Sequence, residues 1–200
     1  MICIFIFESK MKSITDYFTV TSKSNEEVKD YLYYPRKYRD IDYTILYNEV
    51  KDVIRDNYKR KTGVCCHVED MEIMRSLYPK LHLVEWTPIV ECIKNDLERQ
   101  FNKQIDYALI QYYENGNAGI GWHSDSEALN TFVVGVSFGT VRKFYIRNIL
   151  SKEVTDKILL VHGDVIYMKD GFQLKYEHSV PNEPKVHDPR ISLTFRQIEF

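Results

Sequence analysis

Residues 111–127 read QYYENGNAGIGWHSDSE, and this stretch carries the first two members of a candidate metal site. His123 and Asp125 are two positions apart, so in an extended segment both side chains leave the same face. An imidazole and a carboxylate on one face supply two of the three protein ligands of a 2-His-1-carboxylate iron centre. The stretch therefore predicts a metal centre that takes one more histidine from elsewhere in the chain.

His178 is the candidate for that third ligand. It lies 55 residues after His123, in the sequence YEHSVP at 176–181. His187 is a rival, but it lies in a proline-flanked turn. Histidine is not scarce in this chain, since the remaining ones are His67, His82 and His162. The choice of His178 therefore rests on its place between the HxD pair and a second motif further downstream.

That second motif is PRISLTFR at 189–196. In an extended strand its apolar side chains share one face and its polar side chains share the other, the latter being Arg190, Ser192, Thr194 and Arg196. An apolar core face backed by two arginines suits a pocket that holds a small dicarboxylate. The alternative is that both arginines are surface residues of an edge strand.

The ordered set of these motifs resembles the AlkB family of iron(II)- and 2-oxoglutarate-dependent dioxygenases, which repair N-alkylated nucleobases. The resemblance covers roughly residues 41–200. Besides the motifs above, it includes Tyr113 and the strand VSFG at 136–139, which is followed by Arg142 and Phe144. The HxD pair alone is a weak signal, whereas its combination with PRxxLTFR is specific.

The resemblance implies that His123, Asp125 and His178 bind iron(II) and leave three coordination positions open. In the family, 2-oxoglutarate takes two of these positions and dioxygen takes the third. The cofactors implied are therefore Fe(II), 2-oxoglutarate as cosubstrate, and O2.

The resemblance also assigns the residues around the cosubstrate. Arg190 would bind the distal carboxylate of 2-oxoglutarate by a bidentate contact, with help from the Tyr113 hydroxyl. Arg196 would lie nearer the iron. Family members carry Asn at the positions of Gln111 and Ser192, and both replacements keep a hydrogen-bonding group while changing its reach.

The substrate implied by the resemblance is DNA with bases of the 1-methyladenine and 3-methylcytosine type. Oxidative demethylation would release formaldehyde, succinate and CO2, and the damaged base would have to be unpaired or flipped to reach the site. The residues that would contact substrate are Glu127, Arg75, Tyr78 and Trp122. Glu127 has the alternative role of a solvated loop acid, and Trp122 that of an anchor for its strand.

Two further functions remain open on the sequence alone. One is an RNA demethylase with the same chemistry. The other is a non-catalytic protein that keeps a nucleic-acid-binding surface and acts as an accessory factor.

The resemblance implies an α+β, mainly β fold: a double-stranded β-helix, or jelly roll, with two or three N-terminal helices packed on one sheet. Residues 105–113 alternate in polarity and predict a strand. Further strands are predicted at about 131–138, 142–147, 158–161, 164–168, 174–180 and 190–198. Residues 62–87 show no clear pattern.

Two helices are predicted ahead of these strands. The first follows from an apolar stripe and ends in a basic cluster that we interpret as a solvated helix end, the stripe being Tyr47, Val50, Ile54 and Tyr58 and the cluster Arg55, Lys59, Arg60 and Lys61. The second begins at Thr87-Pro88, with a hydroxyl at the N-cap and proline at the first turn. Its apolar stripe, which would pack on a sheet, is Ile89, Ile93, Leu97 and Phe101.

Length and composition fit one compact domain, since 200 residues can bury a sizeable core. The net charge of −2 gives no whole-molecule attraction to nucleic acid, so phosphate contacts would have to come from local clusters. The four cysteines, Cys3, Cys65, Cys66 and Cys92, lack zinc-like spacing and suit the reduced thiols of an intracellular protein. The apolar start at residues 1–8 is too short for a signal peptide or a membrane span.

Residues 1–40 are predicted to form a mobile tail ahead of a catalytic domain at 41–200. Residues 11–18, MKSITDYF, resemble a PCNA-interacting peptide in which Ile14, Tyr17 and Phe18 would dock on the sliding clamp. The alternative is an ordinary tail with some apolar residues. We expect a monomer that is not secreted and acts in the nucleus or at other sites of DNA replication.

Overall fold

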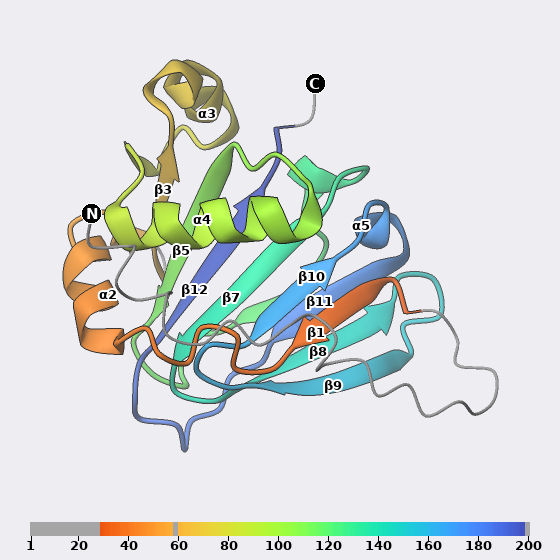
Figure 1. Cartoon of the computed structure of the whole chain (residues 1–200). Coiled ribbons are helices and arrows are strands. Elements are labelled where there is room, and N and C mark those ends of the chain that lie inside the picture. Colours follow the sequence, from red (N-terminus) through yellow and green to blue (C-terminus); the bar gives the residue numbers. More distant parts are fainter. Residues whose placement is uncertain (1–28, 58–59, 199–200) are drawn as a thin grey trace.

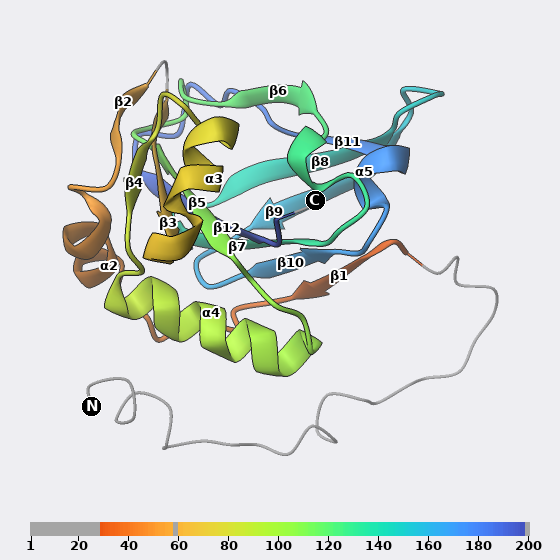
Figure 2. The ribbon, with the colours of Figure 1, turned by 90° about the horizontal axis from the view of Figure 1, so that it is seen from above.

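The computed structural model describes residues 29–57 and 60–198. Two β-sheets face each other as the two walls of a jelly roll, and helices cover the outer face of the larger sheet (Figures 1 and 2). This arrangement confirms the predicted mainly β fold and its helices. Within the described ranges, no helix combines the length and the apolar character needed to cross a bilayer.

The larger sheet has eight strands, which are almost all antiparallel. In spatial order they are β1 (Tyr31–Tyr34), β10 (Val165–Met168), β7 (Val133–Gly139), β12 (Arg190–Arg196), β5 (Tyr107–Tyr113), β3 (Arg60–Cys66) and β2 (Arg55–Asn57), with β4 (His82–Val84) paired in parallel to β3. The last strand of the chain, β12, therefore lies at the centre of the sheet. It pairs with β5 on one side and β7 on the other.

The smaller sheet has four strands and carries two of the candidate metal ligands. Its order is β6 (Ile120–His123), β11 (Tyr176–Val180), β8 (Arg142–Asn148) and β9 (Val154–Leu160). Two short helices flank it, η3 (Ser126–Ala128) directly after β6 and α5 (Phe172–Lys175) directly before β11. The two ligand-bearing strands, β6 and β11, are direct neighbours in this sheet.

Helices α2 (Tyr43–Val50) and α4 (Pro88–Phe101) pack on the face of the larger sheet that points away from the smaller sheet (Figure 2). Their buried side chains join those of β5, β7 and β12 in the main core, including Leu46, Val50, Ile93 and Leu97. A third helix, α3 (Met71–Leu77), follows the 3-10 turn η2 (Val68–Asp70) and lies beside β3 and β4. Figure 1 shows α3 at the same end of the larger sheet as the C-terminal end of β12.

Helix α4 begins where the sequence predicts, but a different residue caps it. The Thr87 hydroxyl makes no capping hydrogen bond. Instead, the Glu49 carboxylate of α2 accepts hydrogen bonds from the backbone N–H groups of Ile89 and Val90, at 2.8 and 3.4 Å. A carboxylate at a helix N-terminus satisfies free N–H groups and complements the helix dipole, so Glu49 ties the two covering helices together.

The structure corrects two sequence predictions near the N-terminus. The domain does not begin at residue 41, because β1 pairs with β10 and Tyr38 is buried in the main core. The first helix ends at Val50, so Ile54 is not helical and Arg55 lies on β2. Of the remaining basic residues, Arg60 and Lys61 begin β3, and Lys59 lies outside the described residues, as Tyr58 does.

Candidate metal centre and cosubstrate site

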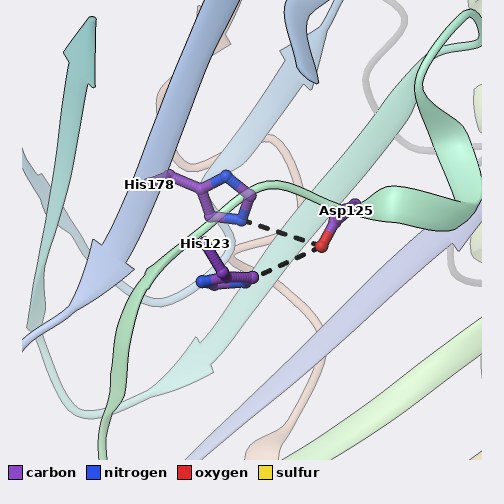
Figure 3. Close-up of side chains that lie close together, drawn as sticks. All are labelled: His123, Asp125 and His178. Atoms are coloured by element: carbon purple, nitrogen blue, oxygen red, sulfur yellow. Dashed lines mark ion pairs between the residues drawn. The ribbon is translucent and has the colours of Figure 1, made fainter. Parts of the chain in front are cut away.

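His123, Asp125 and His178 converge in the space between the two sheets (Figure 3). His123 ends β6 and lies directly opposite His178 on β11 in the antiparallel pairing. Asp125 follows β6 as the residue before η3. One ligand atom from each side chain lies within 4.8 Å of the other two, and within the described residues no other cluster of three such side chains occurs. Strand pairing therefore brings the two predicted histidine ligands together, and the turn that follows β6 adds Asp125.

The two imidazoles are held so that one nitrogen of each faces Asp125. Nδ1 of His123 lies 2.9 Å from the Gly121 carbonyl oxygen, a contact that places the ring proton on Nδ1 and leaves Nε2 free. The Nε2 atoms of His123 and His178 lie 3.7 and 4.0 Å from Oδ1 of Asp125. Burial lowers the pKa of His178 to about 4, so its ring is neutral near pH 7 and can act as a ligand.

The carboxylate of the triad is kept ionised by a buried arginine. Burial alone would raise the pKa of Asp125, but Arg196 and the two histidines outweigh burial and hold it below its ordinary value. An Arg196 nitrogen lies 2.9 Å from Oδ2 of Asp125. Burial alone would lower the pKa of Arg196, yet Asp125, with its neighbours Tyr78, Tyr107 and Glu127, raises it. The pair therefore presents a charged oxygen to the metal position.

Paired residues of β5 and β12 in the larger sheet form the floor of the pocket. Because residues paired across strands share a face, Arg190 lies beside Tyr113, Ser192 beside Gln111, Thr194 beside Leu109 and Arg196 beside Tyr107. The cavity is about 200 Å³ in volume, and its lining includes Gln111, Tyr113, His123, Asp125, Glu127, His178, Arg190, Ser192 and Arg196. All five residues that the sequence assigns to the cosubstrate therefore line the same pocket as the triad.

Arg190 has unsatisfied charge in this pocket. It is 2% exposed and donates from Nε to the Ser137 hydroxyl at 2.8 Å and from Nη2 to the Ser192 hydroxyl at 3.3 Å. Its Nη1 is buried with no hydrogen-bond partner among the described residues. Burial lowers the pKa of Arg190; Tyr113 opposes this effect and Arg142 adds to it. A buried cation in this state requires an anion, which the distal carboxylate of 2-oxoglutarate would supply.

Two of the four residues assigned to substrate lie at the metal end of the pocket. Glu127 lines the cavity and accepts hydrogen bonds from the Tyr78 hydroxyl at 2.5 Å and from Arg196 at 2.7 Å. Arg196 also donates to the Tyr78 oxygen at 2.9 Å. Tyr78 follows α3, so this network connects the covering segment of residues 67–84 with the floor of the pocket.

Like Tyr78, the other two residues assigned to substrate, Arg75 and Trp122, do not line the cavity. Arg75 is exposed on α3. Trp122 points to the opposite face of β6 from its neighbour His123, and the Arg147 guanidinium lies 4.3 Å from its ring centre. Glu177 in turn binds Arg147 at 2.6 Å. Trp122 therefore packs against Arg147 as an anchor of its strand, outside the lining of the cavity.

Three polar residues of the site had no role in the sequence analysis. Ser137 binds Arg190, as described above, and Gln173 accepts a hydrogen bond from the Asp125 backbone. Arg142 is buried and binds the Ala118 and Pro181 carbonyls at 2.8 and 2.9 Å. Ser137 and Gln173 are polar residues between apolar neighbours, a pattern that does not reveal the partner, whereas Arg142 belongs to the motifs that carry the family resemblance.

Comparisons with known proteins agree with this geometry. A model of the 2OG-Fe(II) oxygenase superfamily matches residues 23–196. The chain therefore belongs to this superfamily, whose members use Fe(II), 2-oxoglutarate and O2. Its similarity to alkB homologues, described next, makes it a member of the AlkB family.

The chain is 31% identical over 124 residues to the bovine (Bos taurus) alpha-ketoglutarate-dependent dioxygenase alkB homolog 3, covering 56% of this chain and 43% of that protein. It is 32% identical over 124 residues to the bovine DNA oxidative demethylase ALKBH2, covering 56% of this chain and 44% of that protein. The match thus spans less than half the length of either relative. The solved structure of OsALKBH1 shares the fold, with a TM-score of 0.62, 14% identity, and coverage of 86% of this chain and 100% of that chain.

Proposed function

We propose that this protein is an oxidative demethylase that removes methyl groups from N-alkylated bases in DNA, such as 1-methyladenine and 3-methylcytosine. The observation that carries the proposal is the joint presence, in one pocket, of the His123–Asp125–His178 triad and the unpaired buried nitrogen of Arg190. The first suits a metal ion and the second suits an anionic cosubstrate. A binding module without chemistry would need neither.

The residues of the chain would hold the two groups as follows. Nε2 of His123, Nε2 of His178 and a carboxylate oxygen of Asp125 would bind iron(II), and Arg190, with Tyr113 beside it, would hold the distal carboxylate of 2-oxoglutarate. When bound together, iron(II) and 2-oxoglutarate would activate O2, the oxidant, for hydroxylation of a C–H bond, and 2-oxoglutarate would supply two of the electrons that O2 takes up. Burial of Asp125 and His178 limits the access of bulk water to this chemistry.

The overall reaction balances without any further reactant. One atom of O2 enters the N-methyl group and the other enters succinate, while 2-oxoglutarate loses CO2. The hydroxymethyl group then leaves as formaldehyde and the base nitrogen regains its ordinary valence. Glu127 and Tyr78 are the residues we propose to contact the base, since both lie beside Arg196 at the metal end of the pocket.

DNA is the proposed substrate because the chain is 32% identical over 124 residues to a protein named DNA oxidative demethylase ALKBH2. The test is to incubate the purified chain with iron(II), 2-oxoglutarate and short oligonucleotides that each carry one methylated base. Four matched oligonucleotides are needed: 1-methyladenine or 3-methylcytosine, each in DNA and in RNA. Mass spectrometry follows loss of the methyl group, and His178→Ala serves as the inactive control.

We expect faster demethylation of the DNA oligonucleotides. Faster demethylation of the RNA pair would replace DNA by RNA as the substrate. If wild type and His178→Ala are equally inactive on all four, while the chain still binds the oligonucleotides, a non-catalytic nucleic-acid-binding role takes the place of this proposal.

We also propose that residues 11–18 bind the PCNA sliding clamp and that the protein acts at sites of DNA replication. These residues lie outside the described part of the chain, and the support is the order of Ile14, Tyr17 and Phe18 in the sequence. Tethering would raise the concentration of the enzyme near newly exposed DNA. We further propose that the enzyme acts as a monomer.

A further inference from the structure

Gln173 is a buried amide beside the metal site that the proposed function does not use. It belongs to α5 and is 1% exposed. Burying an amide costs free energy unless hydrogen bonds satisfy it, so the contacts of Gln173 identify what the residue holds. This inference rests on the metal centre of the proposed function.

Both ends of the Gln173 amide have defined partners. Its Oε1 accepts a hydrogen bond from the backbone N–H of Asp125 at 3.0 Å, and its Nε2 donates to Sδ of Met168 at 3.6 Å. A thioether sulfur accepts hydrogen bonds but cannot donate them, whereas a backbone N–H only donates. The two partners therefore fix which end of the amide faces Asp125.

Asp125 needs such a contact because strand pairing does not hold it. The pairing of β6 with β11 ends with His123 opposite His178, and Asp125 lies two residues beyond that point. Neighbouring Ser124 is fixed by a hydrogen bond from its hydroxyl to the Tyr176 carbonyl at 2.9 Å. Gln173 holds the Asp125 backbone by a hydrogen bond in the same way. Helix α5, which leads into the strand of His178, therefore also positions Asp125.

We infer that Gln173 is a positioning residue of the metal centre: its carboxamide fixes the Asp125 backbone and thereby aims the carboxylate at the metal. Some residues orient a metal ligand by a hydrogen bond without binding the metal themselves. Replacing such a residue commonly lowers metal affinity by about 10- to 100-fold. We expect an effect of about tenfold or more on the dissociation constant for Mn(II), used as a stable substitute for iron(II).

The experiment compares Mn(II) binding, followed by the EPR signal of the free ion, in wild type and three variants of the full chain. Gln173→Met keeps the length of the side chain and removes the acceptor. Gln173→Glu keeps an acceptor oxygen at the same reach. Ile93→Ala, in the core on the far side of the larger sheet, is the control for general loss of stability.

The inference predicts that Gln173→Met weakens Mn(II) binding at least about tenfold, that Gln173→Glu recovers most of this loss, and that Ile93→Ala stays within about twofold of wild type despite its lower melting temperature. Wild-type affinity in Gln173→Met would overturn the inference. Equal losses in Gln173→Met and Ile93→Ala would overturn it as well.

A second measurement needs no variant. The Asp125 amide proton should exchange slowly with solvent in the metal-free wild type, although it lies beyond the end of β6, because Gln173 accepts its hydrogen bond. Exchange as fast as that of a free loop amide would overturn the inference. The metal centre and the proposed function can fail separately. If His178→Ala binds Mn(II) as tightly as wild type does, the metal centre itself fails; if Mn(II) binding requires His178 but demethylation is absent, only the proposed substrate fails.

Discussion

His178 lies directly opposite His123 in the antiparallel pairing of β11 with β6, although 55 residues separate them in the sequence. Their ring centres are 4.2 Å apart. Because directly paired residues share a face of the sheet, the register of these two strands sets the distance between two ligands of the metal site. A slip of one residue would turn one imidazole away from the other, so the metal centre depends on the register of the jelly roll.

Asp125 is linked to stability as well as to metal binding, since it neutralises Arg196, which is 3% exposed. Removing one partner of a buried ion pair leaves an uncompensated charge, at a typical cost of about 3–5 kcal/mol. In Asp125→Ala, Arg196 keeps its ion pair with Glu127, so the loss should fall at the low end of this range. We therefore expect Asp125→Ala to lower the free energy of unfolding by about 3 kcal/mol in metal-free protein. Urea unfolding measures this, with His123→Ala as a control that removes a ligand without stranding a buried charge. Equal losses in the two variants would contradict the account.

Arg190 should determine affinity for 2-oxoglutarate. Arg190→Lys keeps a positive charge but loses the planar fork that binds a carboxylate through two hydrogen bonds. We expect the dissociation constant for 2-oxoglutarate, measured by calorimetry on Mn(II)-loaded protein, to rise at least about 30-fold, which corresponds to about 2 kcal/mol. Lys157→Met, which removes an exposed charge from β9, should leave it unchanged. An unchanged dissociation constant in Arg190→Lys would transfer the anchoring role to Arg196.

Glu49 should stabilise the fold from outside the site, because it accepts hydrogen bonds from the first turn of α4. Loss of a capping side chain costs about 0.5–2 kcal/mol, so Glu49→Ala should lower the free energy of unfolding by about 1 kcal/mol. Thr87→Ala, at the position that the sequence selects as the cap, should cost less. Thermal or urea unfolding distinguishes the two, and a larger loss in Thr87→Ala would return the capping role to the threonine.

The proposed clamp contact can be separated from catalysis. A peptide of residues 9–24 should bind PCNA in a calorimetric titration, and the same peptide with Tyr17→Ala and Phe18→Ala should not. In the full chain, this double substitution should leave demethylation of short oligonucleotides unchanged. A tail was predicted over residues 1–40, but β1 begins at Tyr31, so any linker between this peptide and the domain ends before that strand. A wild-type peptide that shows no binding heat would make this segment an ordinary tail.

Much of the fold could be predicted where the sequence has a clear period. The alternation up to Tyr113 predicts β5, and the four-residue stripe after Pro88 predicts α4, both as observed. The region of β3 had no readable pattern, because a central strand buried on both faces does not alternate; five of its seven residues are buried. The first helix was predicted to be too long because Ile54 and Tyr58 continue its helical spacing of apolar residues in the sequence.

The residues of the site likewise divide into those that the sequence predicts and those that it does not. The ligands and Arg190 were predicted because their order along the chain matches a specific motif set. The partners of these residues were not, since Ser137 and Gln173 act through contacts made only after distant strands pair. Trp122 lies outside the cavity because it is adjacent to His123 in the sequence, which places it on the opposite face of β6.

The most direct test of the account measures the coupling between cosubstrate and substrate oxidation. Wild type is incubated with iron(II), O2, limiting 2-oxoglutarate and an excess of single-stranded DNA that carries 3-methylcytosine, and both succinate and formaldehyde are quantified. The account predicts one formaldehyde for each succinate, dependence of both products on the methylated base, and neither product with His178→Ala. Succinate formed without formaldehyde or without loss of the methyl group would show that the site oxidises something other than alkylated DNA, and would contradict the proposed function.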